Sequence, residues 1–194
     1  MDTGPDGWAG AAPGIARARE LFLDEAHGYG CAETTFVVLK EAFGLADAAD
    51  SSAAMALNGG LAYGGGPCGA VSGSALALGL LYGSREPDHA TAKRLAREAT
   101  ARLMDDFETE FGALDCRELL GHEIRTPEAH AAFIESGRWR TICMRQIEFA
   151  IAALAPLAGP VQAAAPDAVA DAAPVVAQDP SPDRVPLSRA SGPS

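Results

Sequence analysis

Apolar residues recur with the spacing of an α-helix along most of the chain. When every third or fourth residue is apolar, these residues lie on one side of a helix. Three such stripes end at Gly44, at Gly112 and just before Pro156, which are residues that stop helices. The stripes consist of Ala32, Phe36, Leu39 and Phe43; of Leu95, Ala99, Leu103, Phe107 and Phe111; and of Trp139, Cys143, Ile147, Ile151 and Leu154.

A further helix is predicted over residues 15–26, before a His-Gly-Tyr-Gly sequence at 27–30 interrupts the pattern. No segment alternates between apolar and polar residues for long enough to indicate a β-strand. The sequence therefore predicts an all-α fold, a compact bundle of five to six helices with a glycine-rich loop before a buried helix of small residues.

Residues 51–84 form a stretch of 34 positions without one charged side chain, and nine of them are glycine. A membrane-spanning helix needs about 20 predominantly apolar residues, whereas glycines and Pro67 divide this stretch. We expect instead two helices buried inside the domain, over residues 52–57 and 68–81. Small residues recur every four positions on the second helix, at Gly69, Gly73 and Ala77 and at Ala75, Gly79 and Gly83. Such smooth faces allow two backbones to approach closely, either inside one subunit or between two copies in a homodimer.

The composition changes near both ends of the chain. Residues 156–194 hold eight of the thirteen prolines, no aromatic residue and six charged residues, which leaves too little apolar surface to offset the entropy lost on folding. We predict a flexible N-terminal arm at 1–13, a four-cysteine helical domain at 14–155 and a disordered Ala/Pro-rich tail at 156–194. The residues from Asp183 to Arg189 are a candidate docking peptide, although an inert tail has the same composition.

The chain carries 15 basic and 26 acidic side chains, which give a formal net charge of −11. Binding to nucleic acid or to an anionic membrane surface requires a basic face, so neither partner is expected. The first residues contain no basic and apolar segments of the kind that direct export. A cytoplasmic location is therefore expected. In that reducing compartment, cysteines serve as ligands or redox groups more often than as structural disulfides.

The four cysteines are Cys31, Cys68, Cys116 and Cys143, and no two of them form a Cys-x-x-Cys motif. This spacing weakens the case for a zinc ribbon and for a thioredoxin-like dithiol. Each cysteine is expected in the first turn of a helix, where unpaired N–H groups and the helix dipole favour an anion. We therefore expect lowered thiol pKa values and a setting that suits an iron–sulfur cluster. From these residues alone, a cluster site, a redox dithiol, structural zinc and four unrelated buried thiols all stay open.

Other polar residues near the cysteines are weaker candidates. His27 and His122 are candidate ligands or proton donors, because they lie four residues before Cys31 and six after Cys116, whereas His89 and His130 are expected in solvent. We expect Asn58 to satisfy a carbonyl group of its own loop. The glycines at 64–66 are not followed by the lysine and hydroxyl residue of a phosphate-binding loop.

The cysteine motifs carry a resemblance to a known family. Cys68 opens a Cys-Gly-Ala-x-x-Gly sequence, Cys31 lies in Gly-x-Gly-Cys-Ala, Cys116 opens Cys-Arg-Glu-Leu-Leu-Gly, and Cys143 stands on the closing helix. Over residues 16–154 the chain resembles the C-GCAxxG-C-C (CGAxxG) family of redox-active proteins, which also forms the C-terminal part of split-Soret cytochrome c. The resemblance implies an iron–sulfur cluster held by Cys31, Cys68, Cys116 and Cys143. We favour 2Fe-2S over 4Fe-4S because its core fits four thiolates from dispersed helix ends, although a 4Fe-4S cluster needs the same four ligands. Because the chain lacks a Cys-x-x-Cys-His sequence, no covalently bound haem is expected.

These observations predict a small redox protein that transfers electrons between one iron–sulfur cluster and an unknown partner protein. The first alternative is a thiol–disulfide oxidoreductase without metal, in which Cys68 attacks and another cysteine resolves the mixed disulfide. The second alternative is a non-redox interaction protein that its tail recruits to an assembly.

Overall fold

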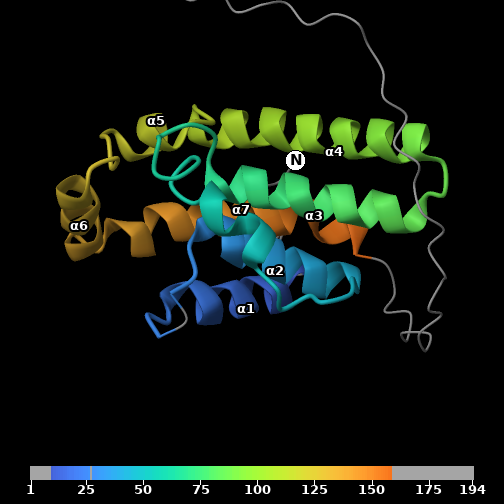
Figure 1. Cartoon of the computed structure of the whole chain (residues 1–194), viewed down its shortest axis with the longest axis horizontal. Coiled ribbons are helices and arrows are strands. Elements are labelled where there is room, and N and C mark those ends of the chain that lie inside the picture. Colours follow the sequence, from blue (N-terminus) through green and yellow to red (C-terminus); the bar gives the residue numbers. More distant parts are fainter. Residues whose placement is uncertain (1–9, 27, 159–194) are drawn as a thin grey trace, which may run out of the picture. The chain divides into compact units, whose positions relative to one another are not determined.

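The computed structural model describes residues 10–26 and 28–158, and every regular element in them is helical (Figure 1). The α-helices are α1 (Ala12–Leu23), α2 (Cys31–Phe43), α3 (Gly69–Arg85), α4 (His89–Phe111), α5 (Cys116–Leu120), α6 (Pro127–Glu135) and α7 (Ile142–Leu154). Three short 3-10 helices, η2 (Ser52–Leu57), η3 (Arg138–Arg140) and η4 (Ala155–Leu157), complete this part of the chain. The prediction of an all-α fold is confirmed.

The helices differ from the sequence-based prediction at α1 and at α6. The first helix begins at Ala12 rather than at residue 15, because Pro13 fits the first turn, where its missing N–H costs nothing. The nine-residue α6 carries no long apolar stripe and was not predicted, although Thr126 caps it and Pro127 opens it. Residues 159–194 of the predicted tail, with the docking peptide, and the first nine residues of the predicted arm lie outside the described residues. The first two residues of the predicted tail belong to η4, and the last two of the predicted arm open α1.

Helix α2 is the centre of the bundle. It packs against α1, α3, α7 and η2, and every residue from 32 to 40 is buried. Even Lys40 is only 4% exposed. Its ammonium group donates to the carbonyl oxygens of Asp47 and Asp50 at 2.7 and 2.6 Å and lies over the ring of Phe36. The predicted stripe of Ala32, Phe36, Leu39 and Phe43 is thus part of a helix that is covered on all sides.

Small residues bring α3 close to α2, as predicted for the first of its two faces. A Cβ added at Gly69 would collide with the sulfur of Cys31, and one added at Gly73 would come within 2.5 Å of the Ala32 carbonyl oxygen. The second face is different, because Gly79 and Gly83 are exposed and a Cβ there would meet no atom within 4 Å. The expected close packing therefore uses one face inside the subunit, and the homodimer stays a prediction.

The prediction of a buried helix over residues 52–57 was wrong. The segment is the 3-10 helix η2, and Ala54 is its only buried residue. Met55 is 60% exposed. The uncharged sequence reflects a position at the edge of a cavity rather than a place in the core. Among residues 10–26 and 28–158, no helix combines the length and hydropathy that crossing a bilayer requires.

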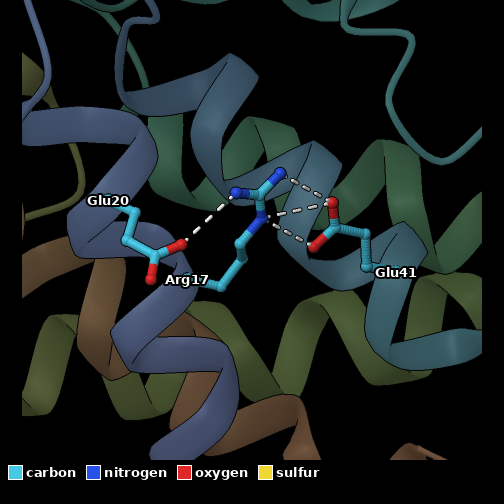
Figure 2. A network of polar contacts seen from close by, with 3 residues as sticks. All are labelled: Arg17, Glu20 and Glu41. Atoms are coloured by element: carbon cyan, nitrogen blue, oxygen red, sulfur yellow. Dashed lines mark hydrogen bonds and ion pairs between the residues drawn. The ribbon is translucent and has the colours of Figure 1, made fainter.

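A polar network on the surface joins α1 to α2. The guanidinium group of Arg17 donates to the carboxylate of Glu41 at 3.2 Å and to that of Glu20 at 3.4 Å (Figure 2). Because Arg17 and both acids are partly exposed, such pairs contribute about 0–1 kcal/mol each. The network helps to set the orientation of α1, whereas the buried side chains provide most of the stability.

Candidate functional site

All four cysteines begin helices. Cys31 is the first residue of α2, Cys68 is the N-cap of α3, Cys116 is the first residue of α5, and Cys143 is the second residue of α7. All four thiols are free, and all except Cys31 are buried. The prediction that the cysteines lie in the first turns of helices is confirmed. Their sulfurs are therefore placed next to backbone N–H groups that have no partner within the helix.

A short backbone pairing holds Cys68 and Cys116 beside each other. Pro67 and Asp115 form an isolated antiparallel bridge. The N–H of Cys68 donates to the Leu114 carbonyl at 2.8 Å, and the N–H of Cys116 donates to the Gly66 carbonyl at 2.7 Å. Two cysteines that are 48 positions apart in the sequence are thus fixed by their own backbones.

The loop before this bridge forms an unusual left-handed turn. Five consecutive residues have positive φ angles between 49° and 72°; they are Gly59, Gly60, Leu61, Ala62 and Tyr63. For residues other than glycine, this conformation costs roughly 1–2 kcal/mol each. The turn closes through bonds from the N–H groups of Gly65 and Gly66 to the carbonyls of Gly59 and Gly60. The strain lies directly beside the cysteines, which is where strained backbone tends to have a functional role.

Asn58, just before this turn, connects η2 to the start of α2. Its side-chain oxygen accepts from the N–H of Ala32 at 2.9 Å and lies 4.0 Å from the sulfur of Cys31. Its amide nitrogen donates to the Glu33 carboxylate at 2.8 Å and to the Met55 carbonyl at 3.2 Å. The carbonyl that Asn58 binds therefore belongs to η2 and not, as had been expected, to the loop. The contacts around Cys31 also went beyond what the sequence had indicated.

Glu33 is a buried carboxylate with three hydrogen-bond donors. It is 8% exposed and accepts from the N–H of Gly30 at 3.1 Å, from the Ser51 hydroxyl at 3.1 Å and from Asn58. Glu33 is the third residue of α2 and reaches back to the N-cap position, as in a capping box. Gly30 followed three residues later by Glu33 was the sequence signal for this arrangement. It holds the helix end that carries Cys31.

Cys68 occupies the most enclosed position of the four. It is 2% exposed, and its thiol donates to the side-chain oxygen of Gln146 at 3.4 Å. Gln146, from α7, is itself 4% exposed. No sequence pattern singles out Gln146, because it is one of three polar residues on α7, with Arg145 and Glu148 beside it.

The thiol pKa values are raised, contrary to the expectation from helix N-termini. Burial is the main cause for all four, and the charge of Cys31 further raises the pKa of Cys68, Cys116 and Cys143. The pKa of Cys116 is raised to about 12, and that of Cys68 lies well above its ordinary value. Backbone N–H groups of Gly59, Ala32 and Gly69 partly oppose the rise at Cys31. Desolvation therefore outweighs the helix ends, and the thiols are protonated at neutral pH when no cation is bound.

A cavity of about 590 Å³ opens beside three of the cysteines. Cys31, Cys116 and Cys143 line it, whereas Cys68 does not. Aromatic and aliphatic side chains form a large part of the rest of its wall; they are Phe22, Tyr29, Met55, Tyr63, Leu120, Ile124, Phe133, Ile134 and Trp139. Sequence patterns do not indicate this wall, because residues from α1, η2, α5, α6 and η3 meet there only after folding.

One of the histidines, His130, is not in the position that the sequence predicted. His130 lines the cavity, and its ring centre is 4.4 Å from that of Tyr63, so it does not lie free in solvent. His122 contacts the Leu120 carbonyl and the Phe133 ring and is not part of the cavity wall. His89 is exposed at the start of α4, as expected. The candidate His27 lies outside the described residues.

Comparisons with known proteins support the assignment of the cysteine motifs. A family model described as "Putative redox-active protein (C_GCAxxG_C_C)" matches residues 29–157, a segment that contains all four cysteines. No curated protein and no solved structure matches the chain. Within the part of the chain that the structure describes, no three His, Cys, Asp or Glu side chains are grouped as the ligands of a single metal ion.

Proposed function

The chain belongs to the C_GCAxxG_C_C family of redox-active proteins, and on that basis we propose that Cys31, Cys68, Cys116 and Cys143 bind one iron–sulfur cluster. The observation that carries the proposal is that four free cysteines stand at four helix starts, and that Cys31 interacts electrostatically with each of the other three. Cysteine thiolates are the usual ligands of both 2Fe-2S and 4Fe-4S clusters. We expect the 2Fe-2S form.

The electrostatics of the site support a bound cation. Burial and mutual repulsion oppose four thiolates, and a cationic centre removes this penalty because a coordinating thiol loses its proton. Backbone N–H groups of Gly59, Ala32 and Gly69 already act on the Cys31 sulfur. Such donors stabilise charge on a ligand sulfur and tune the potential of a cluster.

A cluster, when bound, would supply one-electron chemistry, and the chain's own residues would provide its ligands and its access. The cavity brings solvent and other molecules to the side of Cys31, Cys116 and Cys143, while Cys68 and Gln146 remain enclosed. The net charge of −11 would attract a partner protein with a basic face. Electron transfer to such a partner, like the cytoplasmic location, stays a prediction.

The same observations weigh against a metal-free dithiol enzyme with Cys68 as its nucleophile. The thiolate is the attacking form, whereas Cys68 is buried and its pKa is raised well above the ordinary value. Interaction through the tail, the other alternative, concerns residues outside the described part of the chain.

The test is metal analysis and an absorption spectrum of the full chain purified without oxygen. We expect iron and acid-labile sulfide with visible absorption, and we expect Cys68→Ser and Cys116→Ser to lose all three. Ser72→Ala is the matched control, because Ser72 lies one turn from Cys68 and bonds only to helix carbonyls; it should retain them. A colourless protein that takes up no iron and sulfide on anaerobic reconstitution would refute the cluster.

A further inference from the structure

The cavity beside the cysteines is larger than a cluster requires. Its volume of about 590 Å³ lies in the range of small-molecule sites, roughly 300–1,000 Å³. A cluster of at most eight inorganic atoms would occupy about 240 Å³, if each atom takes about the 30 Å³ that one water occupies in the liquid. Room for a ligand of about a dozen non-hydrogen atoms would remain.

Much of the cavity wall is apolar and aromatic. Phe22 and Trp139 form its edge-to-face pair, with ring centres 5.2 Å apart. Trp139 is held in place on its other sides, because its N–H donates to the Ile134 carbonyl at 3.3 Å and the guanidinium of Arg140 lies 4.4 Å from its ring centre. Arg140 also pairs with Glu25 of the turn after α1. The wall is therefore built and fixed rather than open to collapse.

Large apolar side chains remain exposed at the same place. Met55 is 60% exposed, Ile134 45% and Tyr63 39%, and all three line the cavity. Leu61, next to Tyr63 in the left-handed turn, is also 60% exposed. In the described residues only two other large apolar side chains are this exposed, Leu80 and Met104. Exposed apolar surface gathered at a cavity mouth is typical of a binding site.

The charges of the cavity exclude an anionic ligand. Among the described lining residues there are three carboxylates, Asp24, Glu25 and Glu33, and no lysine or arginine. A phosphate or carboxylate ligand would have to enter without a cationic side chain on the wall, which is unfavourable in a partly desolvated cavity.

We propose that this cavity binds a neutral, planar aromatic molecule of one or two rings, held between the wall of Phe22, Phe133 and Trp139 and the sulfur atoms of the cysteines. Among redox-active molecules, quinones have this size, planarity and neutrality, and their reduced hydroquinone forms are aromatic. The inference deepens the proposed function by naming the ligand class of the cavity, but its evidence is the size, wall and charge of the cavity itself.

The test uses two probes with the same ring system and different charge, 2-naphthol and 2-naphthoate, titrated calorimetrically near pH 7. We expect 2-naphthol to bind with a dissociation constant of roughly 0.1–1 mM, and 2-naphthoate at least about tenfold more weakly. Equal binding of both probes, or no binding of 2-naphthol up to several millimolar, would overturn the proposal.

Two variants locate the binding. Ile134→Glu adds a charge at the exposed mouth and should weaken 2-naphthol binding at least about fivefold, because the charge opposes an apolar ligand. Met104→Glu makes the same change on α4, at exposed apolar surface away from the cavity, and should leave binding unchanged. Equal weakening by both variants would assign the binding to general surface hydrophobicity and refute the cavity.

The emission of Trp139 provides an independent signal. The chain has two tryptophans, so Trp8→Phe leaves Trp139 as the single one, and 2-naphthol should change its emission with the calorimetric dissociation constant. The titration is done on metal-free and on iron-loaded protein. If the protein takes up no iron but binds 2-naphthol, the cluster is refuted and the ligand site stands. If the iron-loaded protein does not bind 2-naphthol, the ligand site is refuted and the cluster stands.

Discussion

Gly73 and Gly79 stand on the same helix but meet different surroundings. Gly73 faces α2, where an added Cβ would approach the Ala32 carbonyl oxygen to 2.5 Å, whereas the space around Gly79 is empty within 4 Å. A backbone atom cannot move aside as a flexible side chain can. The contact at Gly73 therefore fixes how closely Cys68, at the start of α3, approaches Cys31, at the start of α2.

This difference predicts opposite effects of the same substitution. Gly79→Ala should raise the free energy of unfolding by about 0.5–1 kcal/mol, because alanine loses less backbone entropy in a helix. Gly73→Ala should lower it by about 1–3 kcal/mol, because α2 and α3 must separate. Urea unfolding of metal-free protein, followed by circular dichroism, measures both values. If Gly73→Ala raised the free energy of unfolding as much as Gly79→Ala does, the close packing of α2 on α3 would be contradicted.

Among the elements, the left-handed turn is the least expected from its sequence. Leu61, Ala62 and Tyr63 adopt positive φ angles that residues other than glycine rarely take. Its partners explain why it forms. The turn presents Gly65 and Gly66 to the segment around Cys116, and it places Asn58 and Gly59 at Cys31. The chain thus uses tertiary hydrogen bonds to hold a conformation that is locally unfavourable.

Relief of this strain gives a prediction with an internal control. Ala62→Gly should raise the free energy of unfolding by about 0.5–1 kcal/mol, because glycine accepts a positive φ without the steric cost. Ala101→Gly, at an exposed position inside α4, should lower it by about 1 kcal/mol. Thermal and urea unfolding of the two variants provide the comparison. If both variants lose stability equally, the left-handed turn is not strained at Ala62.

For the whole molecule, the sequence predicted the structural features that depend on residues close together along the chain. The helix of Phe36 and Leu39 and the placement of each cysteine at a helix start follow from apolar spacing, caps and glycines, which are local signals. The sign of the thiol pKa shift could not be predicted in this way. Desolvation of Cys68 depends on residues as distant in sequence as Gln146, and it outweighs the helix dipole that the sequence does indicate.

The cavity was missed for the same reason. Its wall combines Phe22 of α1 with Phe133 of α6 and Trp139 of η3, and no periodicity relates these positions. His130 was expected in solvent, yet folding places it against Tyr63, which lies 67 positions earlier in the sequence. Local patterns therefore located the sulfur atoms, whereas the space beside them results from long-range packing.

The buried thiols make the stability of the metal-free protein depend on pH. Their pKa values are raised in the folded chain, whereas unfolded thiols ionise near pH 8.5. Above that pH the unfolded state releases protons that the folded state keeps, so the free energy of unfolding falls as pH rises. For Cys116 the fall extends from about 8.5 up to its folded pKa of about 12.

The expected slope is about 1 kcal/mol per pH unit for each thiol, measured by urea unfolding of anaerobic, metal-free protein between pH 8.5 and 10. Cys116→Ser removes one titrating group and should reduce the slope by about 1 kcal/mol per pH unit. Ser72→Ala should leave the slope unchanged. A bound cation takes the place of the protons on the thiols, so iron-loaded protein should show a much flatter dependence over the same range. Equal slopes for the wild type and Cys116→Ser would show that Cys116 already ionises in the folded chain, as the helix start alone would predict.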